Sequence, residues 1–289
     1  MNRFYRATGV LLSVLLGLTI SNMSMAAAAS LPAAPSSGWN DWACKPSAKH
    51  PEPVVLAHGM GANGVDNFLT LAPTLVAAGY CVYSTTYGAT ALGTAVAGLG
   101  PMDQSAATFS SFVDQVLKST GATKVNVVGH SEGTTVPAYY MKFLGGDKKV
   151  DRFVGFGANY AGTTLQGLAT LAKGLGLQPL LNQVGCPACS QYLPGSEFLK
   201  KLNDGGAAVP GPHYVNIASK YDLVVSPYTS GFLQAPNVEN ITLQDLCAAD
   251  FSGHISQAVD PNVASLIKYH LDPDHAAKPK CVPFWALGA

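Results

Sequence analysis

Charged side chains are scarce in this 289-residue chain. Asp, Glu, Lys and Arg together make up 12% of the sequence, with 17 basic and 17 acidic residues, whereas an average soluble protein has about a quarter. The even balance gives no reason to expect nucleic acid or an anionic membrane as a partner, because both attract a marked basic excess. A chain with so little charge either buries much of its surface or binds apolar partners.

The most apolar stretch is too short to cross a bilayer. Residues 9–20 follow Arg3 and Arg6 and precede a run of small residues, which together form the three parts of a secretory signal peptide. A membrane-spanning helix needs about 20 apolar residues. We therefore expect residues 1–29 to be removed on export, and we expect a secreted, extracellular protein without a stable membrane anchor.

The cysteines lack a metal-ligand pattern. Six cysteines form an even set, and behind an export signal such a set indicates disulfides. The C-x-x-C pair has no second such pair or nearby histidine for zinc, and no strand-then-helix context for a thioredoxin-like redox site, so we interpret it as structural. Fifteen pairings are possible in principle; sequence order favours three local loops, Cys44–Cys81, Cys186–Cys189 and Cys247–Cys281.

The mature chain, of about 260 residues, alternates between predicted strands and helices. Short apolar or β-branched runs predict strands at residues 53–57, 80–87, 124–129, 150–156 and 213–218. Helical spacing of apolar residues predicts helices at 67–78, with Asp66 as N-cap, and at 103–120, 132–144 and 261–271. This alternation predicts an α/β fold with a mostly parallel central sheet and helices on both faces.

One segment breaks the alternation. Residues 159–196 carry a single charge, Lys173, and a series of leucines at positions 165, 168, 171, 175, 177, 180 and 181. Two interpretations fit: a pair of ordinary core helices, or an apolar cap over the ligand-binding edge of the sheet, extending over about 159–205. Uncharged residues 88–102 follow the second predicted strand at its carboxyl end, where open α/β sheets bind ligands. The two stretches together could wall an apolar pocket.

The sequence VVGHSEGTT, residues 127–135, contains the motif G-x-S-x-G. It follows a predicted strand and opens a predicted helix, and in this context the two glycines allow a strained turn that exposes the serine hydroxyl. A serine that only caps the helix is the alternative. Because an N-cap needs no glycine on either side, the motif favours Ser131 as a nucleophile.

A serine hydroxyl attacks efficiently only when a base removes its proton and an acid fixes that base. In this architecture the residues follow in the order serine, acid, histidine. Asp222 comes shortly after the strand predicted at 213–218, and His254 lies in a loop before the helix predicted at 261–271. We expect Asp222 to be the acid and His254 the base.

Other carboxylates and histidines fit this scheme less well. Three later aspartates follow no predicted strand that aligns with Ser131: Asp245, Asp250 and Asp260. Four other histidines fit less well as the base. His270 lies in a predicted helix and His275 in the polar tail, while His213 precedes the acid and His50 lies in the N-terminal loop.

The tetrahedral intermediate of acyl transfer also needs two backbone N–H donors. Glu132 directly follows the serine at a helix start, where amides are unpaired. The second donor is expected in the loop after the first predicted strand, where Met60 is the candidate. His58 in that loop is then an orienting, hydrogen-bonded residue, and the loop has neither the lysine nor the spacing of a P-loop.

Four stretches of the sequence resemble secreted bacterial lipases of the α/β-hydrolase superfamily, above all the actinobacterial class 2 lipases and esterases. They are PVVLAHGMG (53–61), VNVVGHSEGTTVPAYYMKFLGG (125–146), SKYDLVVSPYTSGF (219–232) and SGHIS (252–256). The segment GCPACSQYLPGSEFLKKLNDGG (185–206) resembles the family's region before the acid, and the similarity extends from about Trp39 to Leu271.

This resemblance implies an α/β-hydrolase fold over residues 53–289, after an N-terminal extension at 30–52, with an apolar cap or lid insertion. It also implies hydrolysis of carboxylic esters without a cofactor. Ser131, Asp222 and His254 would form the catalytic triad, and Met60 and Glu132 would supply the oxyanion donors. The expected partner is a lipid or ester substrate. The protein itself is expected to be a monomer that contacts the lipid–water interface transiently.

Two features depart from the family pattern. Thr134 stands where relatives often have a second glycine, which crowds the start of the helix. Some relatives bind calcium near the histidine loop, and Asp250 or Asp260 would be candidates here. No clustered carboxylate pattern supports a metal site, and the Cys247–Cys281 bridge could hold the loop instead.

Several functions remain compatible with this pattern of residues. The same triad would serve a short-chain carboxylesterase, an acyltransferase or a polyester hydrolase. A non-catalytic binding protein on a hydrolase fold is the remote alternative, since fold alone does not fix function.

Overall fold

The structure is a computed structural model that describes residues 38–164, 166–168 and 185–286. The expected signal peptide, residues 1–29, lies outside these ranges, and so does the first part of the expected N-terminal extension. The expected cap at 159–205 is described except for residues 165 and 169–184, which include most of its leucines. In the described ranges no helix is both long and apolar enough to cross a membrane.

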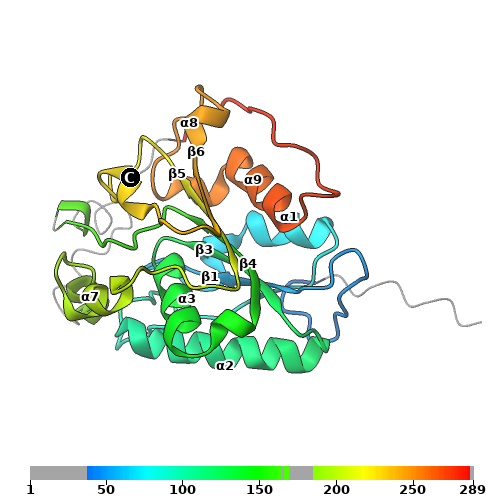
Figure 1. The fold of residues 1–289 in the computed structure, drawn as a ribbon, viewed down its shortest axis with the longest axis horizontal. Coiled ribbons are helices and arrows are strands. Elements are labelled where there is room, and N and C mark those ends of the chain that lie inside the picture. Colours follow the sequence, from blue (N-terminus) through cyan, green and yellow to red (C-terminus); the bar gives the residue numbers. More distant parts are fainter. Residues whose placement is uncertain (1–37, 165, 169–184, 287–289) are drawn as a thin grey trace, which may run out of the picture. The chain divides into compact units, whose positions relative to one another are not determined.

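A six-stranded sheet with the order β2-β1-β3-β4-β5-β6 forms the centre of the fold (Figure 1). All of its neighbouring strands pair in parallel. Its strands are β1 (Val54–Ala57), β2 (Val82–Ser84), β3 (Val125–His130), β4 (Val150–Phe156), β5 (His213–Ala218) and β6 (Val238–Thr242). This arrangement confirms the predicted α/β class with a parallel central sheet.

Helices cover both faces of the sheet. Helices α2 (Met102–Thr120) and α3 (Glu132–Phe143) lie on one face, and α1 (Leu71–Ala77) and α9 (Pro261–Leu271) lie on the other (Figure 1). Alternate strand residues point to opposite faces, so Val55 packs in the core beneath α2 and α3 while Val54 packs in the core beneath α1 and α9. Burial on both faces explains why the strands appear in the sequence as short continuous apolar runs.

Shorter elements complete the described fold. They are the α-helices α6 (Pro187–Gln191), α7 (Glu197–Asn203) and α8 (Leu243–Leu246), and the 3-10 helices η1 (Asp66–Phe68), η2 (Gly146–Lys148), η3 (Tyr228–Gly231) and η4 (Ser256–Val259). Of these, η1 and η4 contact each other, and both lie beside the candidate site described below.

The helix predicted at 67–78 is wrong in its first turn. The chain forms η1 and then α1, and Asp66 is the first residue of η1 instead of a cap for a longer helix. Its carboxylate accepts hydrogen bonds from the backbone N–H of Asn63 at 2.8 Å and from Asn63 Nδ2 at 2.7 Å. Local bonds between side chain and backbone compete with helix formation, and here they hold residues 63–66 in a turn.

The strands differ from prediction at the two edges of the sheet. The strand predicted at 80–87 is limited to Val82–Ser84, and the edge strand β6 was not predicted. Polar residues such as Glu239 and Asn240 interrupt the apolar pattern of β6, as an edge exposed to solvent allows. Because β6 ends at Thr242, Asp245 does follow a strand, contrary to the prediction. It pairs instead with Lys220 on the surface, at 3.1 Å.

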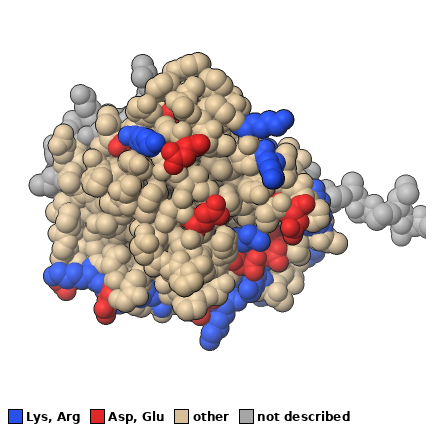
Figure 2. Space-filling model, turned by 45° about the horizontal axis from the view of Figure 1, so that its top comes forward, with Lys and Arg blue, Asp and Glu red and all other residues tan. Residues whose placement is uncertain are grey.

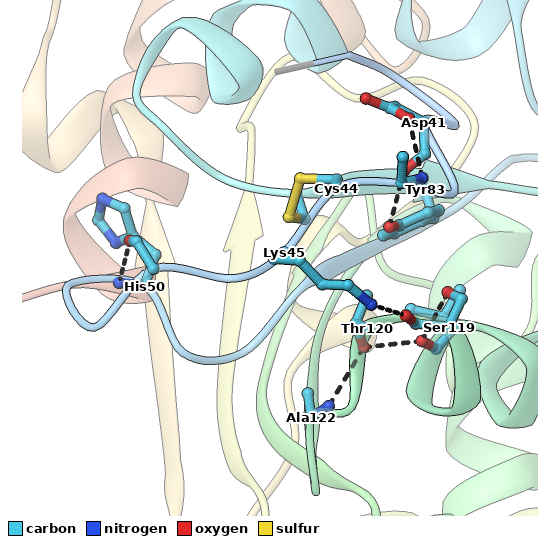
Figure 3. The surroundings of a disulfide bond; sticks show 12 residues. Asp41, Cys44, Lys45, His50, Tyr83, Ser119, Thr120 and Ala122 are labelled. Carbon is cyan, nitrogen blue, oxygen red and sulfur yellow. Dashed lines mark hydrogen bonds between the residues drawn. A yellow bond between two sulfur atoms is a disulfide. The ribbon is translucent and has the colours of Figure 1, made fainter. Parts of the chain in front are cut away.

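Three disulfides crosslink segments outside the sheet, and one of them lies directly beside β2. They join Cys44 to Cys81, Cys186 to Cys189 and Cys247 to Cys281, the same pairs that sequence order favours. The first fastens the N-terminal segment beside β2, where the Tyr83 hydroxyl donates to the carbonyl oxygen of Asp41 at 2.9 Å (Figure 3). A closed loop of this length restricts the unfolded chain by about 3–4 kcal/mol in the chain-entropy account.

A test of the close packing between α3 and β1 is provided by Gly133→Ala. A Cβ at position 133 would overlap the carbonyl oxygen of Ala57, a backbone atom of β1 that cannot move aside. We expect a loss of about 3 kcal/mol or more, at the upper end of overpacking effects, measured as the free energy of unfolding in urea.

The matched control is Gly145→Ala. Position 145 has open space around it but a φ of +77°, so the change should be limited to the penalty of about 1–2 kcal/mol for a left-handed conformation. Equal stability of the two variants would contradict the packing argument.

Candidate active site

The turn between β3 and α3 presents Ser131 in a strained conformation. Ser131 has φ +55° and ψ −119°, a region that residues other than glycine seldom occupy. A Cβ at Gly129 would overlap the carbonyl oxygen of Gly133, so the turn excludes a side chain there. The Ser131 side chain makes no capping hydrogen bond to α3, which argues against the interpretation of this serine as a helix cap.

Thr134 fits into this crowded helix start through two contacts. Its hydroxyl donates to the carbonyl oxygen of Ser131 at 2.7 Å, and its backbone N–H donates to the same oxygen at 2.8 Å. Its methyl group faces Gly155 on β4, where a Cβ would come within 2.9 Å of Thr134 Cγ2. The extra bulk at position 134 is therefore matched by a missing side chain on the adjacent strand.

The structure brings Ser131, His254 and Asp222 together in one line of hydrogen bonds. His254 Nε2 lies 2.8 Å from Ser131 Oγ, and His254 Nδ1 lies 2.7 Å from Asp222 Oδ2. A carboxylate only accepts, so Nδ1 carries the ring proton and Nε2 is free to accept from the serine hydroxyl. All three side chains are buried.

Asp222 remains ionised although it is buried. Burial alone would raise the pKa of its carboxyl, but His254 and the backbone N–H groups of Val225 and Val224 outweigh that effect and lower the pKa below its usual value. The two N–H groups donate to Asp222 Oδ1 at 2.8 and 2.9 Å. Oδ2 is thus left to hold the His254 ring, with Gln257 Nε2 at 3.4 Å as a further donor.

Met60 and Glu132 each offer an unpaired backbone amide. Within the described part of the chain, neither N–H donates to a protein acceptor. Both residues flank the serine: Glu132 follows it in sequence, and Met60 lines the same cavity as Ser131. The loop of Met60 is held from both sides, because Gly59 N–H donates to Asn67 Oδ1 at 2.7 Å and Gly61 N–H donates to the Ala97 carbonyl at 2.8 Å.

His58 supports this loop as a neutral ring. Its Nε2 accepts from the backbone N–H of Tyr87 at 3.1 Å, its Nδ1 lies 2.9 Å from the Gly59 carbonyl, and its ring stacks on that of Tyr87 with centroids 4.0 Å apart. Burial lowers the pKa of His58 to about 4. Both nitrogens are therefore engaged in holding the backbone, away from Ser131.

The sequence indicates Glu132 only as a backbone N–H donor, and the buried position of its side chain was not predicted. The carboxyl is fully buried, and neither of its oxygens has a hydrogen-bond partner among the described residues. It lies behind the Met60 loop: a Cβ at Gly98 would be 3.0 Å from Met60 Cα and 3.3 Å from Glu132 Oε2. Burial raises the pKa of Glu132 well above its usual value, which favours the protonated form of this carboxyl.

A cavity of about 390 Å³ opens directly onto Ser131 and His254. Its walls come from the Met60 loop, from η1, and from the segment around η4: Gly59, Met60, Gly61, Ala62, Asp66, Asn67, His130, Ile255, Ser256, Ala258 and Val259. Apart from Asp66, none of the wall residues outside the Ser131–His254 pair carries a charge at neutral pH. The arrangement can therefore receive an apolar group next to the serine hydroxyl.

The rival carboxylates and histidines make other contacts. Asp250 is bonded to Ser252 and Asn262, and Asp260 caps α9 by accepting from Asn262 N–H at 2.7 Å. His50 and His275 lie near Asp272, and His270 lies near Glu239. No group of three or more His, Cys, Asp or Glu within the described ranges is placed to hold a metal ion.

Comparison with known proteins places these features in a family. A sequence model of the family described as Lipase (class 2) matches residues 51–264. Among solved structures, Aspergillus fumigatus lipase B is similar with a TM-score of 0.63 and 19% identity, over 83% of this chain and 57% of that one. Bacillus licheniformis lipase BlEst2 in its mature form is similar with a TM-score of 0.57 and 16% identity, over 78% of this chain and 94% of that one. At these identities the structural likeness concerns the fold alone.

Asp250 and Asp260 bracket the His254 loop as a pair of buried carboxyls. The Oδ2 atom of Asp260 has no hydrogen-bond partner among the described residues. Burial, together with the adjacent Asp250, raises the pKa of Asp260 to about 7. An unfolded aspartate ionises near pH 4, so the folded state binds the proton more tightly and loses stability as the pH rises from about 4 to 7.

The change Asp260→Asn tests this effect. Asparagine keeps the acceptor for Asn262 N–H and is neutral at every pH, so the variant should lose less stability than wild type between pH 5 and 8, measured by urea unfolding. The matched control, Asp245→Asn, alters an exposed carboxylate and should follow the wild type. A decline in Asp260→Asn as steep as in wild type would contradict the assignment of a raised pKa.

Proposed function

This chain belongs to the class 2 lipase family, and we propose that it is a secreted serine hydrolase that cleaves fatty acyl esters in the manner of a triacylglycerol lipase. Membership of the family makes it a carboxylic ester hydrolase. The observation that carries the finer proposal is the line of hydrogen bonds from Ser131 through His254 to Asp222, set at the mouth of an apolar cavity.

In the proposed acylation step, His254 Nε2 takes the hydroxyl proton as Ser131 Oγ attacks the ester carbonyl. Asp222 holds the ring through Nδ1–H and stabilises the imidazolium that forms. The amides of Met60 and Glu132 donate to the oxyanion, and each such donor contributes about 3–4 kcal/mol to lowering the barrier. His254 then gives its proton to the leaving alcohol, and an acyl-enzyme remains on Ser131.

Deacylation repeats these roles with water. His254 Nε2 removes a proton from a water molecule, whose oxygen attacks the acyl carbonyl, and the same two amides receive the second oxyanion. The proton then returns to Ser131 Oγ as the fatty acid leaves. The raised pKa of Glu132 supports this assignment, because it favours a protonated carboxyl, whereas a carboxylate behind the Met60 loop would oppose the negative charge of the oxyanion.

Apolar surroundings favour an uncharged, acyl-bearing substrate. Ala62, Ile255, Ala258 and Val259 line the cavity, and each methylene of an acyl chain buried there contributes about 0.8 kcal/mol. On the face shown in Figure 2 the described basic and acidic side chains are few and interspersed, without a broad patch of one sign. The proposal of secretion has its support in the expected signal peptide and in three disulfides, which persist in oxidising compartments.

Replacement of Ser131 by alanine tests the nucleophile. Hydrolysis of p-nitrophenyl esters should fall by about 10³-fold or more, and covalent labelling by a fluorophosphonate should disappear, as seen by mass spectrometry of the intact protein. The matched control is Ser111→Ala on the exposed side of α2, which should leave both unchanged. Labelling that persists in Ser131→Ala would refute the assignment.

The change Ala258→Trp tests the acyl site. The indole would fill the cavity, so kcat/KM for a twelve-carbon acyl ester should fall by about 10-fold or more while that for an acetate ester changes little. Ala107→Trp, on exposed α2, is the control. A parallel fall for both esters would place the acyl chain elsewhere. Wild-type activity that prefers short soluble esters, measured below and above the solubility limit, would favour an esterase instead of a lipase.

A further inference from the structure

A second line of hydrogen bonds runs beside the line from Ser131 to Asp222. It begins at the backbone N–H of Gly59, which donates to Asn67 Oδ1 at 2.7 Å. It continues from Asn67 Nδ2 to His130 Nδ1 at 3.0 Å, and from His130 Nε2 to the backbone carbonyl of His254 at 3.0 Å. Asn67 and His130 thus connect the loop before Met60 with the loop that carries His254.

The direction of each bond in this line is fixed by its two ends. Gly59 N–H can only donate, so Asn67 turns its oxygen to Gly59 and its Nδ2 to His130. The carbonyl of His254 can only accept, so His130 Nε2 carries the ring proton. His130 Nδ1 is then an acceptor, which suits the Nδ2 donor at 3.0 Å better than the Oδ1 atom at 3.2 Å.

His130 is held in this single neutral form. Burial, together with the nearby His254, lowers the pKa of His130 to about 3. Its ring stacks against that of Phe156 with centroids 4.8 Å apart, and lies 5.3 Å from the ring of His254. The titratable groups facing it are His254, Asp222 and His58. A fixed ring with one proton can therefore serve as a rigid spacer between two loops.

We propose that Asn67 and His130 are positioning residues that hold the base His254 in register with the oxyanion loop. The inference rests on the proposed function of the Ser131 site, and neither side chain takes part in proton transfer. Gly59 precedes Met60, the proposed oxyanion donor, and the His254 carbonyl belongs to the same residue as the base. One relay thus sets the positions of both groups relative to Ser131, which directly follows His130 in sequence.

Such a relay acts on the rate of the chemical step. A general base works within about 2.6–3.2 Å of the proton it accepts, and a misplacement of about 1 Å can reduce the rate by 10²-fold. Asn67 and His130 also line the cavity, but its apolar wall around Ala258 and Val259, which would hold the acyl group, lies outside the relay. Loss of the relay should therefore lower kcat and leave KM nearly unchanged.

Two substitutions of His130 separate its two hydrogen bonds. In His130→Gln, the side-chain amide reaches as far as Nε2 and can still donate to the His254 carbonyl, so the base keeps its link to the residue before Ser131 although the bond to Asn67 is lost. In His130→Asn, the shorter side chain reaches only the position of Nδ1 and can keep the bond to Asn67 alone. We expect His130→Gln to retain kcat within about 5-fold of wild type and His130→Asn to lose about 10- to 100-fold, with KM within about 2-fold in both.

Coupling between the two residues is tested with Asn67→Ala, alone and combined with His130→Asn. If they form one relay, the double variant should lose little more kcat than the more impaired single variant. Measurements are kcat and KM on a soluble p-nitrophenyl ester, the rate of fluorophosphonate labelling, and the thermal midpoint of each variant, with Ser131→Ala as the inactive reference.

Equal kcat losses in His130→Gln and His130→Asn, or losses in the double variant that multiply, would overturn the inference. A rise in KM with unchanged kcat would also overturn it. Should His130→Asn fail to fold, Asn67→Ala is compared with a double variant that combines Asn67→Ala and His130→Gln. One relay again predicts nearly the same kcat in the two, and a further loss in the double variant that multiplies would overturn the inference. Failure of the proposed function is recognised separately, because Ser131→Ala would then be labelled as wild type is.

Discussion

The close approach of α3 to β1 is the constraint on which the rest of the site depends. Gly133 lies against the carbonyl of Ala57, and Gly129 lies against the carbonyl of Gly133. These contacts leave room for no side chain, and between them the chain passes through the positive φ of Ser131. The same contacts bring the loop after β1, with the Met60 amide, next to the serine. Backbone packing thus brings the proposed nucleophile and both proposed oxyanion donors close together. Polar side chains such as Asn67 then hold them in place.

Burial and hydrogen bonding shift the pKa values of two buried carboxyl groups, Asp222 and Glu132, in opposite directions. Asp222 has two backbone N–H donors and His254, so its pKa lies below the usual value and it stays ionised. Glu132 has no partner among the described residues, and burial raises the pKa of its carboxyl well above the usual value. The site therefore keeps negative charge on the side of His254 that faces away from the serine and disfavours it behind the Met60 loop. This polarity suits a reaction that places positive charge on His254 and negative charge near Met60.

The sequence predicts the elements with strong local signals and misses those determined by distant contacts. The apolar runs at β1, β3, β4 and β5 and the spacing in α2, α3 and α9 indicate their elements nearly to the residue. The edge strand β6 and the break before α1 were missed, because Asn240 and Asn63 make polar contacts that no periodic pattern reveals. Motif and chain order place Ser131, Asp222 and His254 as candidates. The relay through Asn67 and His130 joins residues 63 positions apart, so no local pattern indicates it.

We propose that Ser131, His254 and the amides of Met60 and Glu132 act on one carbonyl carbon. A crystal structure of the enzyme after reaction with a long-chain alkyl phosphonate tests this proposal. We expect phosphorus bonded to Ser131 Oγ, a phosphoryl oxygen within about 2.7–3.1 Å of both amide nitrogens, and the alkyl chain between Ala62 and Ala258. A phosphoryl oxygen that points away from Met60 and Glu132, or phosphorus on another residue, would contradict it.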